Sequence, residues 1–151
     1  MSYNRGQLVA NHPKPNHNSA VEYQGSCVPF VTSSQVGTTV EKIKFPRVTR
    51  FIVVSNRHGS NDLSFGFTVN GLNGPLGTEG NASGYEVTGS NANYFTLAAG
   101  QMTDRLEIKC DGLFIKAAGA GTDFSIIAGI TNVSKNQFLK LSGSDGWQGV
   151  G

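Results

Sequence analysis

Leu63-Ser64-Phe65-Gly66-Phe67-Thr68-Val69 is the stretch of sequence that decides the fold. Large apolar side chains alternate here with small or polar ones, and a period of two is typical of a β-strand with one buried face. The four large side chains would share that face, and each would contribute roughly 1.5 to 3 kcal/mol on burial. A face this apolar predicts a second sheet packed against it.

Short runs of the same kind lie on both sides of this stretch, from residue 38 onward, with turn residues between them. No segment of useful length has the period of a helix. The predicted strands cover 38–45, 48–55, 63–69, 94–97, 105–110, 113–117 and 124–130. An eighth would come from the N-terminal segment or from residues 85–88. The sequence therefore predicts an all-β fold, a two-sheet antiparallel sandwich arranged as a single jelly roll of about eight strands.

The two ends of the chain differ from this central sandwich domain, which we place at residues 36–134. Residues 1–35 are interrupted by prolines and contain few apolar side chains, so we expect an extended N-terminal arm that needs a neighbouring surface to become ordered. Residues 135–151 form a C-terminal tail that carries the only tryptophan, Trp147, among glycines. Such an aromatic side chain would insert into a pocket of its own or of a neighbouring subunit. Residues 70–92 form a long Gly-rich loop, of the kind that is usually functional or mobile.

The composition restricts the class of protein. The chain has 151 residues, of which 38% are hydrophobic and 15% charged, and this length fits one folded domain. Because 12 basic residues nearly balance 10 acidic ones, we expect no strong binding to nucleic acid. The apolar runs are far shorter than the roughly 20 residues that span a bilayer. Residues 1–10 also lack the apolar centre of a signal peptide, so we expect neither membrane insertion nor classical secretion.

A local excess of positive charge occurs in a stretch whose only acidic residue is Glu41. It consists of Lys42, Lys44, Arg47, Arg50 and Arg57. A charge run of this kind is usually a solvated strand face, and the alternative is a contact with an anionic partner or with a second subunit.

The two cysteines, Cys27 and Cys110, are far apart in the sequence and match no zinc-binding or CxxC spacing. Cys110 continues the alternation of Leu106 and Ile108, which predicts a small core residue. Free thiols in a reducing compartment are the expected state, and a disulfide between the two cysteines stays open as an alternative.

The sequence contains no set of residues with the spacing of a catalytic site. His12 and His17 flank prolines in the N-terminal arm, His58 lies in a polar turn, and none of them has a partner by spacing. Nucleophile motifs and phosphate-binding loops are absent. The carboxylates are scattered, as solvated surface groups are. We therefore expect a protein that is not an enzyme and has no catalytic residue, cofactor or metal.

The pattern resembles the small single-jelly-roll capsid proteins of icosahedral viruses. The resemblance covers residues 38–133 and is carried by Phe51-Ile52-Val53-Val54, Leu63-Ser64-Phe65-Gly66-Phe67, Tyr94-Phe95-Thr96-Leu97 and Phe124-Ser125-Ile126-Ile127-Ala128-Gly129. It implies a non-enzymatic structural protein of the virion. Such a protein would be made in the host cytoplasm and assemble as a homo-oligomer, for instance a pentamer, with other capsid proteins.

The N-terminal segment favours one kind of capsid protein over another. Shell proteins of small RNA viruses usually carry a strongly basic arm that neutralises the genome, whereas the charged side chains of residues 1–34 are only Arg5, Lys14 and Glu22. The resemblance therefore implies a penton (vertex) subunit or a minor capsid (cement) subunit of a large double-stranded DNA virus.

A carbohydrate- or receptor-binding β-sandwich module is the alternative function, because such a module would also lack catalytic motifs. Tyr85, Tyr94 and Trp147 would then contact a glycan. For the two functions together, the candidate contact residues are Lys42, Lys44, Arg47, Arg50, Arg57, Tyr85, Tyr94, Phe138 and Trp147.

Overall fold

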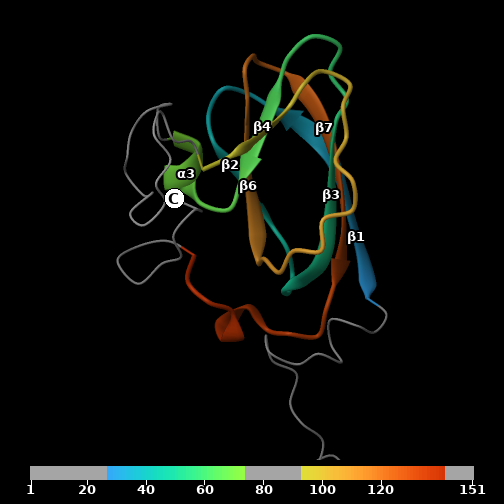
Figure 1. Cartoon of the computed structure of the whole chain (residues 1–151), viewed down its shortest axis with the longest axis vertical. Helices are drawn as coiled ribbons and strands as arrows, with labels where there is room; N and C mark the ends of the chain where they lie inside the picture. The colour runs from blue at the N-terminus through green and yellow to red at the C-terminus, as the bar shows by residue number, and fades with distance from the viewer. Residues whose placement is uncertain (1–26, 74–92, 142–151) are drawn as a thin grey trace, which may run out of the picture.

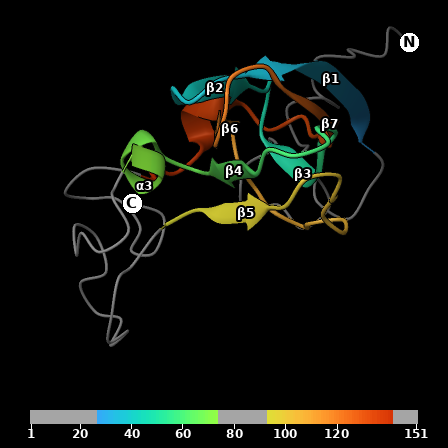
Figure 2. The same cartoon turned by 90° about the horizontal axis from the view of Figure 1, so that it is seen from above.

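Two antiparallel sheets lie face to face in the computed structural model, which describes residues 27–73 and 93–141 (Figures 1 and 2). The three-stranded sheet has the order β1-β7-β3, and the four-stranded sheet has the order β2-β6-β4-β5. The strands are β1 (Val28–Val36), β2 (Glu41–Lys44), β3 (Thr49–Asn56), β4 (Leu63–Gly66), β5 (Phe95–Leu97), β6 (Gly112–Ala117) and β7 (Thr122–Ile130). A short helix, α3 (Val69–Asn73), and a 3-10 turn, η1 (Lys135–Gln137), complete the elements. The predicted all-β sandwich is confirmed.

The strand pairing is that of a jelly roll. Strand β1 pairs with β7, β2 with β6, and β4 with β5, so each strand meets its counterpart counted from the other end of the domain. The remaining position is taken by the segment 101–106, which runs antiparallel along β3 through isolated bridges at Ile52–Leu106 and Ser55–Met102. The chain thus forms a hairpin of nested pairs rolled into two layers, with seven regular strands and one extended segment in the described residues.

The predicted strand 105–110 is wrong in its extent. Leu106 alone of these residues makes a bridge, and the N–H of Ile108 donates to the carbonyl of Leu106 at 2.9 Å, so the chain turns there. The apolar alternation that suggested a strand has another cause. Leu106 and Ile108 both pack against the edge of the core, while the backbone between them bends.

Alternating side chains of the facing strands fill the space between the sheets. This core consists of Val36, Phe45, Ile52, Val54, Leu63, Phe65, Leu97, Cys110, Leu113, Ile115, Ala117, Phe124, Ile126, Ala128 and Ile130. Cys110 is fully buried among them, as predicted for a small core residue. Phe45 is fully buried in this core, and its ring meets that of the partly buried Phe30 edge-on at 5.2 Å between centroids.

The stretch that predicted the sandwich forms a shorter strand than expected. Leu63 and Phe65 are buried on the core face, but β4 ends at Gly66, and Val69 lies in α3 with 44% of its surface exposed. The helix starts here because the Thr68 hydroxyl accepts the N–H of Gly71 at 3.0 Å, which is an N-cap bond. A side chain at Gly66 would come within 2.7 Å of the buried Leu72, so glycine allows α3 to pack closely against the strand. The helix also takes the first residues of the predicted 70–92 loop.

The boundary of the predicted N-terminal arm also changes. Residues 28–35, which the sequence assigns to the arm, lie in β1 and pair with β7 over the whole strand. The interruption by Pro29 misled the sequence-based assignment, because proline is tolerated on an edge strand and β1 is the edge of its sheet. The rest of the arm, residues 1–26, lies outside the described residues, as do 74–92 and 142–151.

Candidate interaction surfaces

The five basic residues of the predicted cluster do not form one surface. Lys42 and Lys44 are exposed on β2, at the edge of the four-stranded sheet. Arg50 and Arg57 lie at the other sheet, where Arg50 Nε is 3.9 Å from a Glu107 carboxylate oxygen and Arg57 makes a long 3.5 Å hydrogen bond to the Ser125 hydroxyl.

Arg47 lies in the turn that joins β2 of the four-stranded sheet to β3 of the three-stranded sheet. Its guanidinium donates to the carbonyl of Asn132 at 2.8 Å, which ties the turn before β3 to the chain after β7. The charge run is therefore divided between two sheets and the turn that joins β2 to β3.

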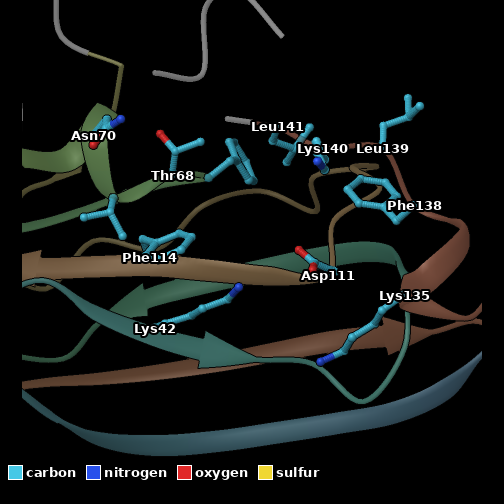
Figure 3. A pocket seen from close by; sticks show the side chains of 12 residues that line it. Lys42, Thr68, Asn70, Asp111, Phe114, Lys135, Phe138, Leu139, Lys140 and Leu141 are labelled. Carbon is cyan, nitrogen blue, oxygen red and sulfur yellow. The ribbon is translucent and has the colours of Figure 1, made fainter. Parts of the chain in front are cut away.

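A pocket on the four-stranded sheet brings together two of the predicted residues, Lys42 and Phe138 (Figure 3). We call it the sheet pocket, and its volume is about 490 Å³. Lys42 lies over the ring of Phe114 at 5.0 Å from the centroid. The other walls come from the start of α3, from the residue before β6, and from η1 and the chain after it. They include Thr68, Asn70, Asp111, Lys135, Leu139, Lys140 and Leu141.

The sheet pocket has more positive than negative side chains in its wall. Lys42, Lys135 and Lys140 contribute positive charge, and Asp111 contributes one carboxylate. Sequence reasoning missed Lys135 and Lys140 because nothing in their spacing relates them to β2. Only the path of the chain after β7, which crosses the end of the sandwich toward α3, brings them there (Figure 1).

A second hollow, which we call the edge groove, is lined by residues of β5 and of the segment 101–106. These two segments lie on the same side of the sandwich (Figure 2). Its volume is about 690 Å³, and Asp104 is the one charged residue among the described residues of its wall. The wall consists mainly of large apolar side chains, namely Phe65, Phe67, Phe95, Leu97, Met102, Leu106 and Ile108. Phe95 is 60% exposed and Met102 is 68% exposed, so the groove presents apolar surface to solvent. Sequence reasoning missed this groove because a phenylalanine in a predicted strand is expected to point inward.

The predicted aromatic contacts divide between described and undescribed residues. Tyr94 is half-buried and packs within the chain, with Lys116 Nζ 5.4 Å from its ring centroid. Lys116 in turn donates to the carbonyl of Leu72 in α3. Tyr85 and Trp147 lie outside the described residues.

Two ionisable side chains that drew notice in the sequence have structural partners. His58 holds its own turn, because its Nδ1 accepts the N–H groups of Ser60 at 3.1 Å and Asn61 at 2.9 Å. Burial raises the pKa of the Cys110 thiol to about 11, although the hydrogen bond with Thr49 acts in the opposite direction. Cys27 and Cys110 are both free thiols in this structure.

Within residues 27–73 and 93–141, no group of three or more His, Cys, Asp or Glu side chains could hold a metal ion. Among the same residues, no helix has the length and apolar character needed to cross a membrane.

Comparison with known proteins gives little to place beside this geometry. No protein family matches the chain, and no curated protein matches it. A solved structure from Bacillus endospore appendages, described as "a novel family of disulfide-linked pili", aligns with 77% of this chain and 99% of its own. The identity is 12% and the TM-score 0.35. A likeness at this level carries no argument about the family or the function of this protein.

Proposed function

We propose that this protein is a non-enzymatic structural subunit of an icosahedral virus capsid, either a penton (vertex) or a minor capsid (cement) subunit. Its partners would be further copies of the chain, in a ring such as a pentamer, and other capsid proteins. Its place would be the virion, after synthesis in the host cytoplasm. The fold alone is an analogy, since a jelly roll serves many functions. The proposal therefore depends on the surface of this particular sandwich.

The edge groove is the observation that carries the proposal. Its exposed Phe95 and Met102 lie at the side of the sandwich, where a neighbouring subunit would pack against it. Monomeric soluble proteins seldom leave contiguous apolar surface of this kind in water. Covering either side chain would contribute up to about 1.5 to 3 kcal/mol. The described wall of the groove has Asp104 as its one ionisable group, which suits adhesion between subunits better than acid-base chemistry.

Oligomeric state provides the first test. We expect the wild-type chain to form a closed ring in light scattering coupled to gel filtration, and the double substitution Phe95→Ser with Met102→Ser to shift it toward smaller species. Val69→Ser is the matched control, because Val69 is also exposed but lies on α3, away from the groove. A chain that stays monomeric at every concentration and binds no other shell component would contradict the proposal.

Location provides the second test. Particles purified by density gradient from cells that make the protein naturally would contain it in a fixed ratio to the other shell proteins, measured by quantitative mass spectrometry. If the protein stays in the fractions without particles, the capsid function is wrong even where the chain forms a ring.

The sheet pocket favours a second candidate function, binding of a glycan or receptor. Its wall combines the ring of Phe114 with hydrogen-bonding groups of Thr68, Asn70 and Lys42, the mixture that sugar sites use. A glycan array would test it. We expect Asn70→Ala and Lys42→Ala to abolish any signal, and an array without signal for the wild-type chain would remove this candidate.

A further inference from the structure

The sandwich has edges of very different kinds. Strand β5 has three residues, and β2 has four, of which Glu41, Lys42 and Lys44 are charged. The open side of β3 is covered by the segment 101–106. Strand β1 is different, because it has nine residues with the sequence VPFVTSSQV and carries no charge. Short length, charge and proline are usual means by which an edge strand is kept from pairing with another chain. Strand β1 has neither short length nor charge, and its one proline, Pro29, is the second of its nine residues, which leaves the rest of the edge open.

The hydrogen bonds of β3 identify which backbone groups of β1 face the open side. Ile52 exchanges both of its backbone bonds with Leu106, at 2.9 Å each, so its N–H and carbonyl point away from β7. Bonded and non-bonded pairs alternate along an antiparallel ladder. Ala128, opposite Ile52, therefore exchanges its bonds with Phe30 on the other side.

The same alternation then gives the orientation of the rest of β1. The even-numbered residues of the strand bond to β7. The N–H groups that point to the open side belong to Val31, Ser33 and Gln35. Pro29, which has no N–H, falls on the same side, where β7 does not need a donor. Among the described residues, no other backbone group bonds to these three N–H groups.

The side chains at this edge are also unusual for a solvent-facing strand. Val31, Ile127 and Val53 are cross-strand neighbours, and they form an apolar row over the outer face of the three-stranded sheet. The row ends at the open edge with Val31, which is 67% exposed, next to Ile127, which is 43% exposed. A parallel row of Ser33, Ser125 and Ser55 follows, with a 2.7 Å bond between the first two hydroxyls.

We propose that β1 pairs antiparallel with β1 of a second copy of this chain, about a twofold axis, and joins the two three-stranded sheets into one continuous sheet. In the register that overlaps all nine residues, Thr32 lies opposite Thr32 of the second copy, and Val31 lies opposite Ser33. The N–H groups of Val31, Ser33 and Gln35 from each copy then find carbonyls on the other. The Gln35 carbonyl, which faces Pro29 of the other copy at the end of the ladder, receives no N–H and stays with water.

A second copy is the occupant that the edge itself selects. The partner must supply a strand of similar length with free backbone groups and no charge, and among the described edges only β1 has these properties. A twofold pairing uses the β1 edge of both copies at once and leaves neither β1 edge open. The contact therefore closes as a dimer and does not grow into a fibre. The inference rests on this edge alone and does not depend on the proposed function.

Substitution at Val31 tests the pairing. In the proposed register the two copies of residue 31 are diagonal neighbours, about 7 to 8 Å apart, so Val31→Lys places like charges together. We expect the dimer Kd to rise about tenfold or more in light scattering and analytical ultracentrifugation. Val69→Lys, an exposed valine on α3, is the matched control and should leave the Kd unchanged. A dimer Kd that Val31→Lys leaves unchanged would overturn the proposal.

A charge pair tests the register. When the Val31→Lys chain is mixed with a Ser33→Glu chain, the introduced ammonium of one copy faces the introduced carboxylate of the other only in the proposed alignment. Native mass spectrometry should therefore show the mixed dimer in excess over its statistical share. A statistical distribution would overturn the register.

Hydrogen exchange on the wild-type chain provides a test that needs no variant to fold. We expect the amides of Val31, Ser33 and Gln35 to gain protection as protein concentration rises, while those of Phe30, Thr32 and Ser34 stay protected at all concentrations by their bonds to β7. If all six amides are protected at every dilution, the chain covers this edge by itself. If the amides of Val31, Ser33 and Gln35 stay unprotected at high concentration, nothing pairs with this edge. Either result would overturn the proposal, and neither would affect the ring expected from the edge groove.

Discussion

Asn56 is the last residue of β3, and the contribution of its buried side-chain amide to the free energy of unfolding can be measured. Its side-chain nitrogen donates to the carbonyls of Asn61 at 2.8 Å, Leu97 at 3.1 Å and Ala98 at 3.1 Å. Its side-chain oxygen accepts the N–H of His58 at 3.1 Å. One fully buried side chain thus joins β3, the turn after it and the end of β5.

Asn56→Ala removes all of these bonds and leaves the carbonyls without this donor. A buried polar group that loses its partner costs about 1 to 3 kcal/mol. The bond to Leu97 is buried and those to Asn61 and Ala98 are partly buried, so water can satisfy part of the loss. We expect the free energy of unfolding to fall by about 3 kcal/mol. For a chain of this length, that corresponds to a decrease in Tm of about 6 to 12 °C.

Chemical denaturation followed by fluorescence or circular dichroism measures the change, and two further variants identify its cause. Asn56→Asp keeps the shape of the side chain but, when ionised, has no hydrogen to donate, so at neutral pH it should destabilise as much as Asn56→Ala. Asn70→Ala changes an exposed asparagine on α3 and should stay within about 0.5 kcal/mol of the wild type. If both changes at Asn56 cost less than about 1 kcal/mol, the three carbonyls do not depend on this amide and the reasoning is refuted.

Three further predictions concern the outer face of the three-stranded sheet, a buried threonine and the core cysteine. A Cβ atom added at Gly129 would lie 2.4 Å from both Cys27 Sγ and the Phe51 ring. Gly129→Ala should therefore lower the free energy of unfolding by about 1 to 3 kcal/mol in thermal melts, and adding Phe51→Ala should recover part of the loss. The Thr49 hydroxyl donates to the carbonyl of Ile108 at 2.8 Å and accepts the N–H of Cys110 at 3.0 Å. Thr49→Val should therefore lower the free energy of unfolding by about 2 kcal/mol in urea titrations. Thr39→Val, at an exposed site, is the control and should change it little. The raised pKa of Cys110 means that the folded state keeps its thiol proton after the unfolded state has lost it. The contribution of Cys110 to stability should therefore be constant below pH 9 and decrease between pH 9 and about 11, and a Cys110→Ala chain should lack that component of the decrease.

The sandwich could be predicted from the sequence because a strand with one buried face requires an apolar side chain at every second residue, and this alternation is visible in the sequence. It was right for Leu63 and Phe65, where the strand is regular and its neighbours are other strands. It failed at Val69, because the cap bond of Thr68 and the close approach at Gly66 are local events that start a helix in spite of the alternation.

The surfaces were harder to predict than the fold. Lys42 and Phe138 were both named as contact residues, but their meeting in the sheet pocket depends on the path of the chain after β7, which no local pattern encodes. The edge groove depends on the segment 101–106, which joins β3 through isolated bridges and whose Met102 is exposed to solvent. The open edge of β1 was not predicted because Pro29 indicates the end of a strand in a sequence, although a proline is acceptable on an edge strand.

The pairing of β1 with β7 has a consequence for how the chain becomes folded. Val28 pairs with Ile130, and Val36 pairs with Thr122, so the first strand of the domain can complete its sheet only after the last strand has left the ribosome. Contacts this distant in the sequence fold slowly, because a long loop must close before they form. A copy in which β7 is not yet made therefore cannot present a finished β1 edge to a second copy, so formation of the three-stranded sheet must come before any pairing through that edge.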